Sequence, residues 1–382
     1  MKKKIAESFA LWFFFLLCLC AMTFFGSSIA GLLCVIFWVL MPLLTWGVNL
    51  LVKNHISVTI SMETTASKKE TKMGYVTVEN TSIFPVAKLY CSITLNNRLT
   101  GEKEKEILRM SAAPKGKTKK VFELSSAYCG YLQAEITGLY LMDWVGFLPV
   151  KCKKTAKAKI AVLPDTFTPH VFLRMSSVMR EDADAWSQVY KGNDQTEVFS
   201  LREYVPGDSL KQIHWKLSSK KGQLIFREAS LPIEKSLLIF WDKNTGETTP
   251  KEMDAMAECV ASVSQVILNQ GYYFTLGWTD GRQILFEYID SEELLLQTVP
   301  QMLKQGCNLS EGSGAFICAQ DESRNSYGKV LYLAKTVPKD FVPFVCTDMT
   351  MVLCDRMTGQ NDWKTVTFQA DTYLEDLEIL EL

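Results

Sequence analysis

The sequence predicts a membrane protein with three parts: a pair of transmembrane helices, a small all-β sandwich-like domain and an α/β domain. Three observations predict them. They are an uncharged apolar run near the start, period-two alternation after it, and buried strand-like runs alternating with amphipathic helices at the end. At 382 residues the chain is long enough for two or three such units. We place them at 8–52, 53–165 and 237–382, with a connecting segment at 166–236.

The N-terminal run carries no Asp, Glu, Lys or Arg from Ser8 to Val52. This is more than twice the roughly 20 residues that one spanning helix needs. Small residues at 26–28 interrupt the run, so it divides into helices over 8–25 and 29–52 that form a tight hairpin. A cleaved signal peptide is the alternative, but its apolar core would far exceed the usual length of about 7–15 residues.

The charges that flank this hairpin predict its orientation. Lys2, Lys3 and Lys4 precede the first helix, and lysines at this position favour the cytoplasmic side. Two spans return the chain to that side, so we expect a two-pass protein of the inner (plasma) membrane with residues 53–382 in the cytoplasm. The 11 cysteines agree, because they include no C-x-x-C pair and are expected to be reduced and buried.

The region that follows the hairpin alternates apolar and polar residues with period two at 56–60, 74–78 and 89–93. Turn-forming residues separate these strands, and such a pattern is typical of a small β-sandwich or barrel. Several lysines near its end are expected to be solvated or to face anionic membrane lipid close to the anchor. They are Lys151, Lys153, Lys154, Lys157 and Lys159.

The segment Glu197–Lys216 is the most distinctive of the chain, with R-E-Y-V-P-G-D followed by I-H-W-K. It resembles the signature of the bacterial domain-of-unknown-function 58 family. Looser support comes from Leu141–Phe147, which is similar to the family's D-x-x-G-x-F turn, and from the two N-terminal spans. The residues that match the signature are Arg202, Glu203, Tyr204, Pro206, Gly207, Asp208, His214, Trp215 and Lys216.

The chemistry of this signature allows two interpretations. Pro206 and Gly207 form a turn in which Asp208 would cap a short helix, and His214 precedes Trp215 in a strand-like alternation. The group would recognise a partner or a phosphate, or it would be an internal network that locks a loop, with Trp215 as its apolar base. We favour the network, because no nucleophile, oxyanion hole or metal set stands beside it.

In the last third of the chain the pattern of apolar and polar residues changes from the period-two alternation of the β-domain. An apolar run at 237–241 ends in Asp242, and strands and helices then alternate, which predicts a parallel, Rossmann-type sheet covered on both faces. We expect helices at 253–269 and 292–304, and further strands at 272–276, 329–334 and 350–354. This order resembles a von Willebrand factor A-type domain, as the family resemblance also implies.

Such domains often hold a divalent cation through D-x-S-x-S after the first strand, and the corresponding residues here begin at Asp242. Asn244 offers an amide oxygen, Gly246 offers no ligand, and Lys243 adds a competing positive charge. Asp280, which follows a later strand, would complete a degenerate site of Asp242, Asn244 and Asp280. We expect no cofactor, and Mg²⁺ at these three residues stays open as the alternative.

The function that these features predict is binding of a protein and not catalysis. The 41 basic and 42 acidic residues form no long basic stripe, which argues against nucleic acid as a partner. The main hypothesis is a membrane-anchored adaptor or assembly factor whose A-like domain presents its strand ends to another protein. The resemblance implies partnership with a MoxR-type AAA ATPase in an envelope-related process. The alternative is a hydrolase of unknown substrate that uses Arg202, Asp208 and His214.

Overall fold

The computed structural model describes residues 2–26, 29–173, 186–205, 213–232, 237–281, 283–307, 312–320, 327–344, 346–355 and 363–382. The chain divides into two compact units, Met1–Leu163 and Pro164–Leu382. The first unit contains the predicted anchor and β-domain. The second contains both the signature segment and the α/β domain, which the sequence analysis had separated.

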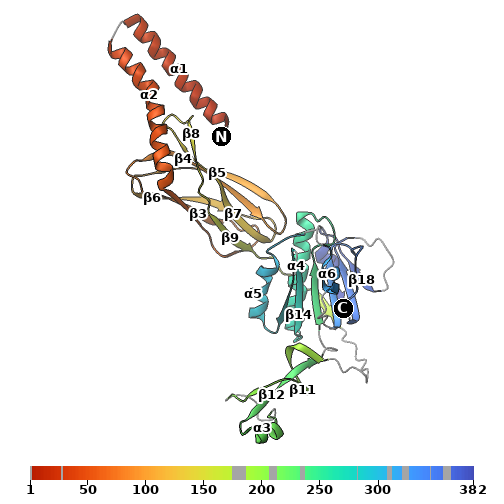
Figure 1. Cartoon of the computed structure of the whole chain (residues 1–382). Helices are drawn as coiled ribbons and strands as arrows, with labels where there is room; N and C mark the ends of the chain where they lie inside the picture. Colours follow the sequence, from red (N-terminus) through yellow and green to blue (C-terminus); the bar gives the residue numbers. More distant parts are fainter. Residues whose placement is uncertain are drawn as a thin grey trace. The chain divides into compact units, whose positions relative to one another are not determined.

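The first unit begins with two long helices, α1 (Lys2–Gly26) and α2 (Ile29–Val52), which lie side by side (Figure 1). They are long and apolar enough to cross a membrane over Ile5–Phe24 and Ile29–His55. Large apolar side chains are exposed along both helices, which is the surface that a lipid environment requires. Examples are Phe13, Phe14, Leu17, Leu32, Phe37 and Leu40.

Two hydrogen bonds connect the helices α1 and α2 next to a proline in α2. Pro42 has no N–H and therefore cannot bond to the carbonyl of Trp38, four residues earlier. The indole Nε1 of Trp12 on α1 donates to that carbonyl at 3.3 Å, and the indole of Trp38 donates to the carbonyl of Trp12 at 3.3 Å. The neighbouring helix thus satisfies the freed backbone group, as helices in lipid must.

The rest of this unit is a sandwich of two sheets. The smaller sheet has three antiparallel strands in the order β1 (Ile56–Ser61), β3 (Lys72–Asn80) and β6 (Gly116–Leu124). The other has the order β2 (Thr65–Ala66), β9 (Lys157–Val162), β7 (Gly130–Met142), β4 (Val86–Asn97) and β5 (Lys103–Ala112), with β8 (Pro149–Cys152) paired to β7. Alternate residues of these strands face one shared apolar core. After a single 3₁₀ turn, η1 (Lys53–His55), α2 continues into β1, so Val52 is buried in that core.

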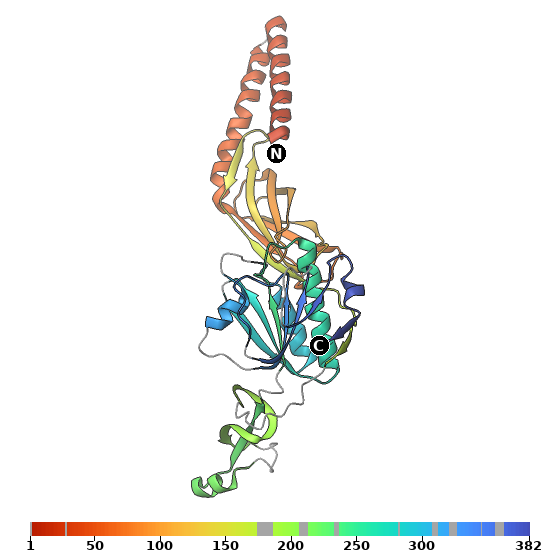
Figure 2. The ribbon, with the colours of Figure 1, turned by 90° about the vertical axis from the view of Figure 1, so that its right-hand side faces the viewer.

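The second unit is built on a six-stranded sheet with helix α4 (Pro250–Asn269) across one face (Figure 2). In sheet order its strands are β15 (Gln283–Ile289), β14 (Phe274–Asp280), β13 (Leu237–Asp242), β16 (Tyr327–Ala334), β17 (Cys346–Leu353) and β18 (Lys364–Thr367). Five strands are parallel, and four of them, β13, β14, β16 and β17, are the ones expected from the sequence. The fifth, β18, and the antiparallel edge β15 were not expected. Further helices are α5 (Glu292–Met302), α6 (Gly314–Gln320) and α7 (Tyr373–Asp376).

Two strand pairs stand outside this sheet. β10 (His170–Phe172) pairs in parallel with β19 (Ile379–Glu381), which joins the two ends of the unit. β11 (Trp186–Glu203) pairs antiparallel with β12 (Ile225–Pro232), and helix α3 (Trp215–Lys221) lies between them in the chain. The signature segment therefore forms a two-stranded ribbon with a short helix.

The start of α4 gives a prediction for the stability of this unit. Thr249 caps the helix in a reciprocal box, because its hydroxyl accepts the N–H of Glu252 and the Glu252 carboxylate accepts the N–H of Thr249. Thr249→Ala removes one half of the box and is expected to lower the free energy of opening the first turn by about 1 kcal/mol. Hydrogen exchange of the α4 amides in the full chain measures this loss. Thr249→Ser keeps the hydroxyl and should exchange like the wild type; equal protection in the alanine variant would refute the capping role.

Candidate functional site

The carboxyl end of β13 lies where the chain order of the sheet reverses, between β14 and β16, and this is the expected ligand position in an open α/β sheet. Asp242 ends that strand and is fully buried. Its Oδ1 accepts the N–H of Asn244 at 3.0 Å. Its Oδ2 accepts the N–H of Ala315 at 3.2 Å and the hydroxyl of Tyr332 at 2.7 Å. The carboxylate therefore connects β13 to α6 and β16.

Burial decides the ionisation of this pair. It raises the pKa of Asp242, and hydrogen bonds from the Gly314 backbone, Tyr332, Asn244 and Ala315 oppose that rise. Burial, together with the charge of Asp242, also raises the pKa of Tyr332 well above its ordinary value. The phenol thus remains protonated and donates to the carboxylate, so the pair links β13 to β16.

Lys243 is also buried, and its ammonium group does not act at the end of β13 as the sequence suggested. Its Nζ donates to the carbonyls of Met302 and Gln305 at the end of α5, and it lies 4.8 Å from the centre of the Trp241 ring. Its backbone N–H donates to the hydroxyl of Thr279 at 2.9 Å. Hydrogen bonds from Lys243 thus connect the end of β13 to α5 and β14.

The loop after β13 closes the remaining side of the strand ends. The hydroxyl of Thr245 accepts the N–H of Lys335 at 3.0 Å, and the hydroxyl of Thr336 donates to the carbonyl of Thr245 at 2.7 Å. Lys335 Nζ pairs with the Glu252 carboxylate of α4 at 2.9 Å. Hydrogen bonds within the chain therefore bridge this edge from β13 to β16.

The residues of the predicted degenerate metal site do not fit a hard divalent cation. Both carboxylate oxygens of Asp242 already accept N–H or O–H donors, and the amide nitrogen of Asn244 points to the carbonyl of Gly281 at 3.5 Å. Asp280 keeps one buried oxygen, Oδ1, without a hydrogen-bond partner. Over the described ranges, no three His, Cys, Asp or Glu side chains gather in a way that would hold an ion. A cation such as Mg²⁺ needs several oxygens held together.

The first half of the signature is part of strand β11. The guanidinium of Arg202 lies 4.5 Å from the centre of the Phe226 ring, opposite it on β12, and Nη1 donates to the carbonyl of Glu203 at 3.0 Å. Tyr204 extends the pairing through its N–H to the carbonyl of Leu224 at 3.0 Å. Pro206, Gly207 and Asp208 lie outside the described residues.

The second half corrects two expectations. The strand-like alternation around Trp215 is wrong, because helix α3 begins at this residue and His214 caps it through Nδ1, which accepts the N–H of Leu217 at 3.2 Å. Trp215 is 63% exposed and is therefore not the apolar base of a locked loop. Gly222, which follows α3 with a φ of 69°, and the basic last turn are helix-end signals that the sequence analysis overlooked.

This ribbon and helix present exposed apolar side chains next to basic ones. We call these exposed residues the signature patch: Leu201, Val205, Trp215, Lys216, Lys220, Lys221 and Leu224. Nδ1 of His214 accepts the N–H of Leu217 in the helix cap, so this nitrogen is already engaged within the chain. An exposed tryptophan among lysines is instead typical of a surface that binds a partner.

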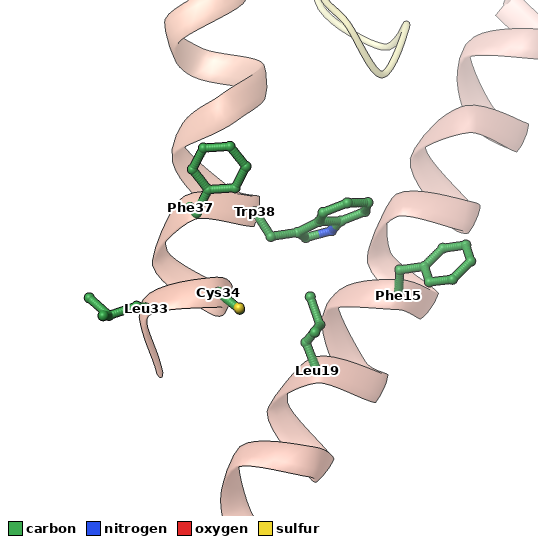
Figure 3. Close-up of a pocket in the computed structure, with 6 residues that line it drawn as sticks. All are labelled: Phe15, Leu19, Leu33, Cys34, Phe37 and Trp38. Atoms are coloured by element: carbon green, nitrogen blue, oxygen red, sulfur yellow. The ribbon is translucent and has the colours of Figure 1, made fainter. Parts of the chain in front are cut away.

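A cavity of about 610 Å³ lies between α1 and α2 (Figure 3). Trp38 and Leu19 point toward the opposite helix, and the lining side chains are otherwise aromatic, aliphatic or thiol. The six are Phe15, Leu19, Leu33, Cys34, Phe37 and Trp38. Such a lining contains no group for acid–base or nucleophilic catalysis beyond one thiol, and it belongs to the membrane-type helices.

Comparison with known proteins gives weak similarities only. No protein family and no curated protein matches the chain. The CARDB domain of PF1109 from Pyrococcus furiosus is similar at 13% identity and a TM-score of 0.22, over 28% of this chain and 94% of that chain. The PapD-like domain 7 of human CEP192 is similar at 10% identity and a TM-score of 0.20, over 28% and 83%. At these TM-scores neither similarity bears on function.

The Asp242–Tyr332 pair gives a prediction with a pH dependence. Tyr332→Phe removes a hydrogen bond to a buried carboxylate, so the free energy of unfolding of the α/β unit should fall by about 1.5–3 kcal/mol at neutral pH. Burial holds the pKa of Asp242 above its ordinary value of 3.8. As pH rises, Asp242 therefore ionises at a lower pH in the unfolded chain than in the folded one. The free energy of unfolding falls between pH 3.8 and the folded-state pKa of Asp242. Losing the phenol raises this pKa further, so the deficit of the variant should grow with pH.

Hydrogen exchange of the β13 and β16 amides across a pH series measures this deficit. Tyr272→Phe is the control, because Tyr272 is an exposed tyrosine of the same unit and its loss should change stability by less than about 0.5 kcal/mol. A deficit that stays constant with pH would show that the phenol does not act through the carboxylate.

Proposed function

We propose that the chain is a two-pass inner-membrane adaptor or assembly factor whose cytoplasmic α/β unit binds a protein partner. The observation that carries the proposal is the coexistence, in one chain, of two membrane-type helices and an exposed signature patch. The helices supply the anchor. The lysines at 2–4 support the cytoplasmic side for everything after residue 52, by the preference of basic residues for that side.

Two features of the α/β unit support the binding role: the exposed signature patch and the hydrogen-bonded strand ends. Its strand order, with β13 as the first strand, runs 3-2-1-4-5-6, which is compatible with the von Willebrand factor A-like domain that we propose. The strand ends, where a cation would act in such a domain, are bridged by hydrogen bonds around Asp242. Trp215 is exposed instead, so we assign the partner contact to the signature patch and propose that it needs no metal.

The partner that we propose is a MoxR-type AAA ATPase acting in an envelope-related process. The support is the resemblance of Glu197–Lys216 to the domain-of-unknown-function 58 signature, whose family is associated with such ATPases. The chemistry of the patch agrees with a protein partner, because an exposed tryptophan on a short helix that also carries three lysines fits an apolar pocket with an acidic rim.

The orientation is tested by protease accessibility. Protease added outside intact spheroplasts is expected to leave residues 53–382 undigested, because the inner membrane shields a cytoplasmic domain. Disrupting the spheroplasts should expose the same residues, which serves as the positive control. Digestion of this large fragment before disruption, or its recovery in the soluble fraction, would contradict the anchor or its orientation.

The partner contact is tested on the full chain in lipid nanodiscs, with the nucleotide-free ATPase of the same cell as ligand. Trp215→Ala should weaken binding by at least tenfold, about 1.4 kcal/mol, because exposed tryptophans that bind partners are frequent hot spots. Tyr273→Ala is the matched control, an aromatic residue of the same unit that is 50% exposed. Its affinity should equal that of the wild type.

The same measurement with a chelator tests the metal-independent contact. The ATPase is free of nucleotide, so the chelator can act only on ions that support the complex itself. Affinity is expected to stay unchanged. A loss of binding on chelation would show that a cation takes part, and an unchanged affinity in Trp215→Ala would place the contact elsewhere.

A further inference from the structure

The loop between β7 and β8 is held by one buried side chain. The Asp143 carboxylate accepts four backbone N–H groups, those of Val145 at 3.0 Å, Gly146 at 3.2 Å, Phe147 at 2.8 Å and Leu148 at 2.6 Å. Gly146 has a φ of +103°, which a residue with a Cβ adopts only with strain. These four hydrogen bonds and the positive φ therefore define the backbone conformation of the loop.

This loop lies along α2 and not in solvent. The backbone N–H of Trp144 donates to the hydroxyl of Thr45 at 3.2 Å. The amide of Asn49, which is buried, donates to the carbonyl of Met142 at 2.8 Å. Two hydrogen bonds one helical turn apart thus align the end of β7 and the start of the loop with the helix.

The aromatic side chains of the loop reach further along both helices. The Phe147 ring lies 5.5 Å from that of Phe9 and 5.3 Å from that of Trp12, both on α1. The Trp144 ring lies 6.3 Å from that of Trp38 on α2, in an edge-to-face arrangement. Trp144 nevertheless remains 50% exposed, so half of a large aromatic side chain faces the surroundings of the helices.

The length of the helices places these contacts within the depth of a membrane. A hydrocarbon core of about 30 Å takes roughly 20 helical residues. Counted from the hairpin connection, 20 residues of α1 reach back to Glu7, its first charge after the lysines, and 20 residues of α2 reach Val48. Phe9 and Thr45 fall within one turn of these limits, Trp12 and Trp38 lie deeper, and Asn49, which bonds to Met142 at the end of β7, lies one residue beyond them.

We propose that the β7–β8 loop is a third membrane element, which inserts Trp144 and Phe147 into the interfacial zone of a phospholipid bilayer beside α1 and α2. Tryptophan and phenylalanine with an exposed aromatic face suit that zone, where apolar rings and polar backbone are both accommodated. The inference rests on the membrane anchoring proposed above and extends it from the helices to the β-domain.

The surroundings of the loop fit the level of the lipid headgroups. The exposed Lys88 donates from Nζ to the carbonyl of Val145 at 2.9 Å. The position of a Cβ at Gly146 would lie 3.3 Å from this Nζ and 3.6 Å from the hydroxyl of Ser8, the residue that begins the uncharged run. An ammonium group at that boundary reaches phosphates while its aliphatic part covers the loop.

The test uses the full chain with 5-fluorotryptophan at its 9 tryptophans, reconstituted in phosphatidylcholine–phosphatidylglycerol nanodiscs. Trp144→Phe, Trp38→Phe and Trp215→Phe each remove one ¹⁹F resonance and so assign it. The variants serve only to assign the resonances, and the broadening is measured on the wild-type protein. Two broadening agents are added in turn, a nitroxide on the lipid acyl chain and a water-soluble gadolinium chelate.

The Trp144 resonance is expected to lose most of its intensity to the lipid nitroxide and little to the chelate, whereas Trp215 should show the reverse. Broadening of Trp144 by the chelate to the extent seen for Trp215 would overturn the insertion. Trp38 separates the two proposals. If the lipid nitroxide broadens Trp38 and not Trp144, only the loop insertion fails; if it broadens neither, the anchoring fails as well.

Discussion

The first unit depends on the continuity of α2, which runs from the apolar hairpin into the core of the sandwich with a single 3₁₀ turn before β1. Val52 is fully buried there, and Asn49 bonds to the end of β7. Because no flexible linker separates α2 from β1, the position of the sandwich is fixed relative to the C-terminal half of α2. Polar groups along that path are bonded within the chain, among them Thr45, Asn49 and the carbonyl freed by Pro42.

Two buried aspartates organise the two units in a related way. Asp143 and Asp242 each follow or end a strand and gather backbone N–H groups around a carboxylate. The partners of Asp143 are its next neighbours in the chain, within residues 145–148, so its contacts are local. Asp242 depends on Ala315 and Tyr332, which are 73 and 90 residues away. Because these two contacts arise only from the fold, the sequence left metal ligation by Asp242 open as an alternative, and the structure shows its carboxylate bonded to distant parts of the sheet.

The same distinction between local and distant contacts explains how far prediction from the sequence reached. The charge-free run located both helices. The alternation located β1, β3 and β4 of the sandwich, and the apolar runs located four of the five parallel strands of the sheet, without β18. Around Trp215 the pattern spans only three residues, from His214 to Lys216, which is too short to separate a period of two from a period of 3.6. The antiparallel edge β15 was missed because its partly exposed residues lack the continuous apolar run of the buried strands.

The placement of exposed and engaged groups decides where a partner can bind the second unit. A binding surface has to offer groups that are free to form new contacts, and at the strand ends the described side chains of Asp242, Thr245 and Lys335 already bond within the chain. Opening that edge would leave buried donors and acceptors unsatisfied, at a cost of about 1–3 kcal/mol for each. Trp215 imposes no such cost, because its ring is already exposed and is desolvated only when the partner covers it. For the protein partner proposed above, the exposed signature patch would therefore cost less to cover than the strand ends, although strand ends are the usual ligand position in open α/β sheets.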